Sequence, residues 1–309
     1  MSHVFGPVPS RRLGWSLGVD LVPFKTCSYD CIYCQLGRTT VHTIQRRDYV
    51  SVADVLQEVE TKLKENPQPD YVTISGSGEP TLNAGLGRVI QGLKRLTSVP
   101  VAILTNGSLL YDQNIREDLA AADLVIPSLD AATIPAFEQI NRPCSQLGLE
   151  RIIEGLQDFA NMFRGRLWIE VMLARGLNDK EEEITALTAV LKDLPVEKIQ
   201  LNTVTRPPAE AFARPLEQEQ MERIAARLGQ RAEIIGHFAG KVYGHGSQQD
   251  IEKEIVTLLS RRPCTLTEIA SLTGLHKTEV TKYIGRLVDG GLIQPVYQEE
   301  VYYRLKTAS

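Results

Sequence analysis

The sequence predicts an α/β fold with a parallel sheet, followed by a smaller domain of helices and a hairpin. Two observations lead to this prediction. Short apolar runs rich in Val, Ile and Leu alternate with helical patterns through about the first 240 residues, an alternation typical of a parallel sheet covered by helices. Beyond a glycine-rich stretch at 236–246, closely spaced helical patterns precede two short strand-like runs.

Six strands are predicted as short apolar runs, each followed by a helical pattern. They are Leu17–Val22, Tyr71–Ser75, Val101–Leu104, Leu124–Leu129, Leu167–Leu173 and Lys198–Thr203. The clearest helix begins after Ser51, a good capping residue, and sets apolar residues from Val52 to Leu63 on one face. The other helical patterns are Ala84–Leu96, Ile115–Ala121, Leu149–Phe163, Lys180–Leu194 and Glu217–Leu228. Sheets of this kind carry their functional groups on loops at the carboxyl ends of the strands.

A second domain is predicted at residues 248–309. Its helices are expected at Ile251–Ser260, Leu266–Leu272 and Lys277–Val288, and its strands at Leu292–Tyr297 and Val301–Leu305. A helix, a helix-turn-helix and then a hairpin is the order of a winged helix. Positive and negative side chains balance in this segment, so a protein-docking or dimerising role is as well supported as binding to DNA.

The composition excludes some classes of protein. The 309 residues include 43% apolar and 23% charged side chains, which suits a folded protein with a sizeable core. A formal net charge of -4 provides no overall basic field for nucleic acid. No apolar run reaches the ~18 residues of a membrane span, and the first residues lack the apolar core of a signal peptide. We therefore expect a cytoplasmic protein with no membrane partner, whose cysteines stay reduced.

Three of the five cysteines, Cys27, Cys31 and Cys34, lie close together in the loop after the first predicted strand. Thiolates at the spacing C-x3-C-x2-C can face one point if the loop wraps around it. Structural zinc sites use four ligands, usually from two separated C-x2-C pairs. A zinc site completed by His42 is therefore the alternative, and a [4Fe–4S] cluster that keeps one iron free is the stronger hypothesis.

Together with the motifs that follow it, this triplet resembles the radical S-adenosylmethionine (SAM) superfamily. Gly76-Ser77-Gly78-Glu79-Pro80, after the second predicted strand, is similar to the family's glycine-glycine-glutamate motif. Thr105-Asn106-Gly107, after the third, is similar to its TNG turn. The resemblance covers about residues 1–240. It implies a partial (βα)6 TIM-like barrel of the radical SAM type, whose cofactors are a [4Fe–4S] cluster and SAM.

The resemblance also implies which residues bind these cofactors. The cluster ligands would be Cys27, Cys31 and Cys34. The SAM contacts would be Tyr33, Gly76, Gly78, Glu79, Asn106, Ser128, Asp130, Gln200 and Asn202. Glycines let the backbone approach the amino group of SAM, and Glu79 offers a negative partner to its ammonium. Gln200 and Asn202 alternate with apolar residues on the sixth strand, so both should face the barrel interior.

The chemistry that the resemblance implies begins at the free iron, which chelates the amino and carboxylate groups of SAM. One electron cleaves SAM to methionine and a 5′-deoxyadenosyl radical, and the radical takes a hydrogen atom from the substrate. The cofactor carries this chemistry, while the protein binds, orients and excludes solvent. The expected partner is an external one-electron donor such as flavodoxin or ferredoxin.

The segment PVPSRRLGWSLGVDL and the CQLG that begins at Cys34 are similar to Fe–S oxidoreductases related to the wyosine-type tRNA modification enzymes. Those enzymes build a tricyclic base on a tRNA guanosine from pyruvate and SAM. Arg11 and Arg12 are candidates for binding phosphate or carboxylate, and the alternative is that they are ordinary solvated arginines. Lys25 is a candidate for the lysine that forms a Schiff base with pyruvate. No cysteine precedes Cys27, so the second cluster of those enzymes has no ligands here.

Three functions follow as hypotheses. The leading one is a radical SAM enzyme that acts on tRNA or another large substrate, with the winged helix docking the tRNA or a protein. The second is modification of a peptide, a protein or a small metabolite, including activation of a glycyl-radical enzyme. The third is an Fe–S transcriptional regulator, against which the intact SAM motifs argue. Cys144 is either a catalytic thiol or a small buried hydrophobe, and lone cysteines are more often the latter.

Overall fold

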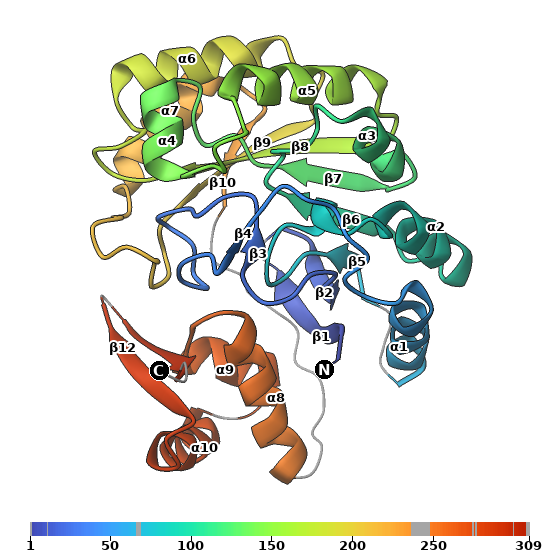
Figure 1. Ribbon diagram of the computed structural model, residues 1–309. Coiled ribbons are helices and arrows are strands. Elements are labelled where there is room, and N and C mark those ends of the chain that lie inside the picture. Colours follow the sequence, from blue (N-terminus) through green and yellow to red (C-terminus); the bar gives the residue numbers. More distant parts are fainter. Residues whose placement is uncertain are drawn as a thin grey trace.

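The computed structural model describes residues 2–10, 12–65, 69–235, 248–273, 275, 277–298 and 300–306 (Figure 1). The helices are α1 (Val52–Glu65), α2 (Leu86–Leu96), α3 (Gln113–Leu119), α4 (Ile134–Ile140), α5 (Leu149–Met162), α6 (Glu181–Lys192), α7 (Gln218–Leu228), α8 (Gln248–Arg261), α9 (Leu266–Thr273), α10 (Lys277–Asp289) and the 3-10 turn η1 (Pro80–Leu82). The strands are β1 (Val4–Ser10), β2 (Gly14–Val19), β3 (Thr26–Cys27), β4 (Val41–His42), β5 (Tyr71–Ile74), β6 (Val101–Thr105), β7 (Leu124–Pro127), β8 (Arg166–Leu173), β9 (Lys198–Thr203), β10 (Ala232–Ile234), β11 (Cys264–Thr265), β12 (Ile293–Tyr297) and β13 (Val301–Leu305).

Eight strands form one sheet in the order β1-β2-β5-β6-β7-β8-β9-β10. β1 runs antiparallel to β2, and the other neighbouring pairs are parallel. The spatial order follows the order along the chain. Because crossovers between parallel strands have one hand, this order places successive helices on the same face of the sheet. Figure 1 shows α2, α3, α5 and α6 along that outer face, which leaves the other face for a ligand site.

The six predicted strands are all present, with ends that differ by a few residues, and two edge strands were missed. β1 holds two prolines, which cannot donate in a strand ladder and are tolerated at a sheet edge. β10 has only three residues, too few for a pattern. In the described part of the chain β1 and β10 are the two edges of the sheet, so the structure is an open, mostly parallel α/β sheet and no closed barrel forms.

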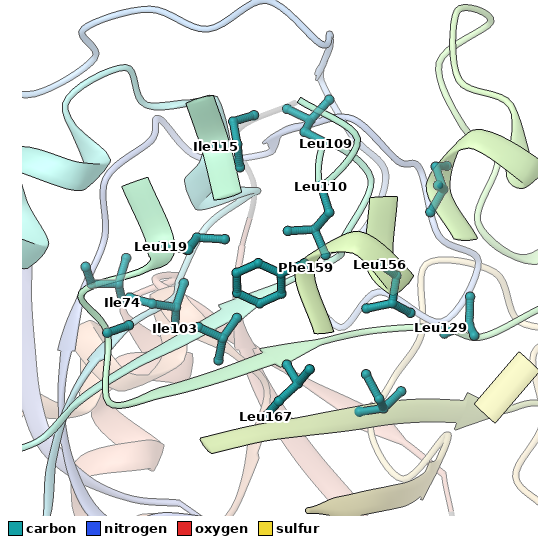
Figure 2. Close-up of a cluster of buried hydrophobic side chains, with 14 of the residues drawn as sticks. Ile74, Ile103, Leu109, Leu110, Ile115, Leu119, Leu129, Leu156, Phe159 and Leu167 are labelled. Carbon is teal, nitrogen blue, oxygen red and sulfur yellow. The ribbon is translucent and has the colours of Figure 1, made fainter. Parts of the chain in front are cut away.

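The core between the sheet and its outer helices is packed around Phe159 of α5. Figure 2 shows the ring among Leu119 of α3, Ile103 of β6 and Leu167 of β8. Phe159 is 0% exposed, and its ring stacks on Phe163 with centroids 4.9 Å apart. This apolar packing fixes α5 against the strands whose following loops form the site described below.

Helices α8 to α10 and the three-stranded sheet β11-β13-β12 form a separate lobe, which we call the C-terminal module. It has its own buried apolar cluster, which includes Ile255, Ile269 and Ile293. Val8 of β1 packs against this cluster, so the module rests on the first strand of the sheet. Figure 1 shows the module beside β1 and below β3 and β4. Its helices and hairpin lie at the predicted places, while the winged-helix assignment itself stays a prediction.

No helix in the described part of the chain is long and apolar enough to cross a membrane. The helices α1, α5 and α8 have 14 residues each, fewer than the ~20 that a span requires. This agrees with the sequence, in which no apolar run reaches that length.

Candidate active site

A cavity of about 1440 Å³, which we call the chamber, lies at the carboxyl ends of the sheet strands. Residues that follow three neighbouring strands reach it: Gly76 after β5, Asn106 after β6 and Ser128 after β7. Cys27 and Tyr33, from the end of β3 and the loop after it, line the same space. Residues of α8, α9, β12 and β13 supply the wall on the side of the C-terminal module. The chamber is therefore placed where parallel α/β sheets bind their ligands.

The three clustered cysteines are free thiols. Each sulfur accepts a hydrogen bond from a side-chain N–H: Asn106 Nδ2 to Cys27 Sγ at 3.6 Å, Asn141 Nδ2 to Cys31 Sγ at 3.6 Å, and Lys25 Nζ to Cys34 Sγ at 3.2 Å. Burial raises the pKa of Cys27 to about 12, and the Glu79 carboxylate adds to the rise. Burial, followed by the charge of Asp130, raises the pKa of Cys31 well above its usual range. A bound cation reverses this preference because it binds the thiolate.

This donor set fits an iron–sulfur cluster better than a single metal ion. Charges on Cys27 and Cys34 both raise the pKa of Cys31, so the three thiols interact electrostatically. Among the described residues, however, no three His, Cys, Asp or Glu side chains could hold one ion. A zinc ion with ~2.3 Å bonds would need its sulfurs about 3.8 Å apart, whereas a cluster binds three thiolates at separate irons. His42 Nε2 lies 3.1 Å from the Ser28 backbone oxygen, which gives the zinc alternative no support.

The GSGEP loop after β5 is fastened to the cysteine loop by backbone hydrogen bonds. The Lys25 N–H donates to Ser77 O at 2.7 Å, and the Glu79 N–H donates to Thr26 O at 3.0 Å. A Cβ atom on Gly78 would lie 1.9 Å from the Thr26 oxygen, so glycine is required for this close approach. The two predicted motifs are therefore adjacent parts of one structure.

Glu79 is buried, with 2% of its surface exposed, and borders the chamber. Its Oε1 accepts hydrogen bonds from Thr81 N–H at 3.0 Å, Thr81 Oγ1 at 2.6 Å and Thr105 Oγ1 at 2.6 Å. Its Oε2 accepts one from Asn106 N–H at 2.7 Å. A carboxylate oxygen has two lone pairs, so Oε2 can also accept from an ammonium. Burial raises the pKa of Glu79 despite these four donors, and a cation in the chamber would offset that effect.

Asn106 and Ser128 also line the chamber, as predicted for SAM contacts. Asn106 Nδ2 donates to Ser28 Oγ at 2.8 Å, and its Oδ1 accepts from Ser108 N–H at 2.9 Å. These bonds hold the turn after β6 against the cysteine loop. The Ser128 N–H donates to Thr105 O at 3.0 Å, which fixes the residue at the end of β7.

Tyr33 lines the chamber, whereas Asp130 lies behind it. The Tyr33 hydroxyl donates to Asp130, which also accepts from Asn141 Nδ2 at 2.7 Å and Met172 N–H at 2.9 Å. Asp130 is buried and is not among the described residues that line the chamber. Burial raises the pKa of Asp130 to about 6. The structure therefore places Asp130 where it orients Tyr33, and its direct contact with SAM stays a prediction.

Gln200 and Asn202 of β9 are likewise buried and stand outside the described lining of the chamber. Gln200 Nε2 donates to Glu233 Oε1 at 2.8 Å, toward the edge of the sheet. Asn202 Nδ2 donates to Glu170 Oε1 at 3.1 Å. Glu170 does line the chamber and pairs with Arg12. Asn202 thus donates a hydrogen bond to a chamber residue, and Gln200 donates one to a residue of β10; their contacts with SAM stay predictions.

The remaining candidates separate into different environments. Arg12 lines the chamber, and Arg11 lies outside the described residues. Lys25 is buried, with its Nζ directed at Cys34 Sγ, and it is not among the described residues that line the chamber. Cys144 is buried in the apolar core, as the interpretation of a small hydrophobe predicts.

A family model described as "Radical SAM superfamily" matches residues 21–188, more than half of the chain. The chain belongs to the radical SAM superfamily. The cofactors of this protein are therefore a [4Fe–4S] cluster and SAM. The matched region includes the cysteine loop, the GSGEP loop and the turn after β6, which meet at the chamber.

Among its relatives, the chain belongs with the UPF0026 proteins. One, from Methanocaldococcus jannaschii, is 35% identical over 312 residues, 98% of this chain and 96% of the relative. A protein named GTPase Obg from Brachyspira hyodysenteriae is 38% identical over 295 residues, 94% of this chain. The chain spans 43% of that relative's length.

Two solved structures share the radical SAM fold with this chain. TYW1 with a lysine–pyruvate adduct bound has a TM-score of 0.54 and 21% identity, covering 69% of this chain and 72% of that one. A radical SAM methyltransferase from Sphaerobacter thermophilus has a TM-score of 0.54 and 16% identity, covering 71% and 65%. At these identities the likeness concerns the fold alone.

Several residues of this radical SAM site were not found from the sequence. Glu170, which lines the chamber, left a local signal, because it is the acidic residue of an otherwise apolar strand pattern. Arg206, Arg261 and Arg262 line the chamber from segments far along the chain. No local pattern distinguishes these arginines from ordinary surface arginines.

Proposed function

We propose that the protein is a radical SAM enzyme that modifies tRNA or another large substrate. The observation that carries the proposal is the junction of the cysteine loop and the GSGEP loop at the chamber, where both Cys27 and Glu79 border one space. In this proposal Cys27, Cys31 and Cys34 hold the cluster. The backbone at Gly76 and Gly78 binds SAM, with Glu79 as the partner of its ammonium.

When bound, the cluster supplies one electron to SAM, whose cleavage gives methionine and a 5′-deoxyadenosyl radical that takes a hydrogen atom from the substrate. The residues of this chain bind and orient the reactants. Glu79 offers its negative charge to the ammonium of SAM. Asn106 fixes the turn after β6 against the cysteine loop, and Asp130 orients Tyr33 at the chamber wall. The C-terminal module supplies one wall of the chamber. An external protein such as flavodoxin or ferredoxin would deliver the electron.

The similarity of its first residues to the wyosine-type tRNA modification enzymes supports an RNA substrate. Arg12, Arg206 and Arg262 line the chamber. Arg206 and Arg262 share one carboxylate oxygen of Glu268, at 2.7 Å and 3.0 Å, so this cluster carries a surplus positive charge. Guanidinium groups in such a place suit a phosphate or a carboxylate of the substrate.

A small anionic metabolite is the second candidate substrate. The chamber volume of about 1440 Å³ exceeds the roughly 300–1,000 Å³ of a typical small-ligand pocket. It can hold SAM with a second small molecule beside it. Residues of the C-terminal module line one side of the chamber, and a small substrate needs less access past them than a polymer does.

We also propose that residues 248–309 form a winged helix and residues 1–240 a radical SAM domain. The order of α8, α9, α10, β12 and β13 supports the first assignment. Because the module contributes a wall of the chamber, it serves the enzyme's own site in this proposal. A role as a DNA-reading regulator gains no support from that arrangement.

The class of reaction is tested with anaerobically reconstituted protein. Reduced with dithionite, it should convert SAM to methionine and 5′-deoxyadenosine, measured by mass spectrometry. The substrate is tested by profiling tRNA nucleosides and metabolites from a strain that lacks the gene. Loss of a modified nucleoside supports tRNA, whereas accumulation of an anionic metabolite with unchanged tRNA supports the second candidate.

A further inference from the structure

Arg261, at the end of α8, reaches from the C-terminal module into the SAM site. Its Nη1 pairs with Asp20 and donates to Ser77 Oγ at 2.9 Å. The guanidinium carbon lies 4.6 Å from the centre of the Phe5 ring. Ser77 is the second residue of the GSGEP loop, so one arginine connects the module to that loop directly.

Asp20 supports the same loop from the sheet side. Its Oδ2 accepts from the Ser77 N–H at 3.1 Å and from Ser77 Oγ at 2.6 Å. A Cβ atom on Gly76 would lie 2.5 Å from the Asp20 carboxyl carbon, and Gly76 has a φ of +151°. The loop therefore lies directly on the Asp20 carboxylate, with no room for a side chain between them.

The buried charge of Asp20 requires a counter-charge, which Arg261 provides. Asp20 has 6% of its surface exposed, and a buried carboxylate is unfavourable without a counter-charge. Among the described residues, Arg261 is the one cation within ion-pair distance of Asp20. If the module undocks, the buried charge beneath Gly76 and Ser77 loses its partner, and the loop loses one of its hydrogen bonds.

We propose that Arg261 is a positioning residue for SAM. By neutralising Asp20 and holding Ser77, it keeps the GSGEP loop in the conformation that binds SAM, so SAM binding depends on docking of the C-terminal module. This inference rests on the proposed function, in which that loop is the SAM-binding loop. Arg261 itself acts through Asp20 and Ser77.

The test compares full-length, cluster-loaded variants at equal iron content. Arg261→Met should weaken SAM binding by about tenfold in a calorimetric titration, and Arg261→Lys should recover part of the loss because it keeps the charge. Asp20→Asn removes the buried charge that Arg261 neutralises. In this background, Arg261→Met should change the SAM affinity less than it does in the wild-type protein. Arg286→Met is the matched control. It breaks an ion pair of 2.9 Å with Glu252 inside the module, and SAM affinity should be unchanged.

A second readout does not depend on the cofactors. In cluster-free protein, the Ser77 amide should exchange its hydrogen faster in Arg261→Met than in wild type or Arg286→Met, measured by mass spectrometry. Wild-type SAM affinity in Arg261→Met would overturn the inference. If Glu79→Gln weakens SAM binding while Arg261→Met does not, the inference fails and the proposed function stands. If neither variant weakens it, the loop is not the SAM site and both fail.

Discussion

The Glu79 carboxylate accepts a hydrogen bond of 2.7 Å from the Asn106 N–H, and this bond joins the loop after β5 to the turn after β6. Asn106 in turn donates to Ser28 in the cysteine loop at 2.8 Å. Three motifs that are separated in the sequence thus share one hydrogen-bonded network. A substitution in any one of these motifs should alter the hydrogen bonds of the other two.

Glu79→Gln should lower SAM affinity by about ten- to a hundredfold, because a charge-assisted hydrogen bond is typically worth ~1.5–3 kcal/mol. The structure adds a second effect. Four donors face the carboxylate, so the amide nitrogen of glutamine meets at least one of them, and the free energy of unfolding should also fall by about 1–3 kcal/mol. Calorimetric titration of SAM and thermal unfolding separate the two effects. Equal SAM affinities at equal cluster content would remove Glu79 from the binding site.

Replacing Cys27, Cys31 and Cys34 together by Ala should abolish the iron content, the absorbance and the paramagnetic signal of the cluster. Cys144→Ala is the control, since this buried thiol packs in the apolar core and should leave the iron content unchanged. Iron and sulfide analysis after anaerobic reconstitution measures both variants. A full cluster in the triple variant, or zinc without iron in the native protein, contradicts the assignment.

Gly78→Ala should disrupt the junction of the GSGEP and cysteine loops. Its Cβ would lie 1.9 Å from the Thr26 oxygen, and overpacking of this kind costs about 1–3 kcal/mol of stability or more. Gly285→Ala is the matched control, and its expected effect on stability has the opposite sign. Gly285 lies in α10, where an added Cβ would have no neighbouring atom within 4 Å. Alanine should therefore stabilise that helix by about 0.5–1 kcal/mol. Chemical denaturation of the two variants checks the contrast, and equal effects would contradict it.

Phe159→Ala should lower the free energy of unfolding by about 3–5 kcal/mol, because it leaves a cavity in the core between α5 and the sheet. Phe212 is 50% exposed, and Phe212→Ala should change stability by no more than about 0.5 kcal/mol. Urea unfolding followed by circular dichroism gives both values. Similar losses for the two variants would mean that Phe159 is not the centre of the core.

Local patterns were enough to predict most of the fold. The six central strands are apolar because both of their faces are covered, and this leaves a clear signal in the sequence. β1 gives no such signal, since its prolines are compatible with an edge but resemble a loop. The motifs at Gly76–Glu79 and Asn106 were found because each lies within a few residues and follows a recognisable strand.

Contacts between distant segments could not be predicted in this way. Asp20 and Arg261 are 241 positions apart, and neither residue carries a pattern that points to the other. The ion pair predicts that truncation before α8 weakens SAM binding, which no local pattern in the sequence indicates. The hydrogen bond between Asp130 and Tyr33 shows the same limit, because the two residues are 97 positions apart and neither carries a pattern that points to the other.

The backbone bonds between Thr26 and Glu79 and between Lys25 and Ser77 have a consequence for how the protein matures. In the proposed site, the strand that carries Cys27 as an iron ligand also supports the loop that binds SAM. Iron bound at Cys27 would therefore also stabilise the support of that loop. We expect newly made chains to bind SAM only once they have bound iron.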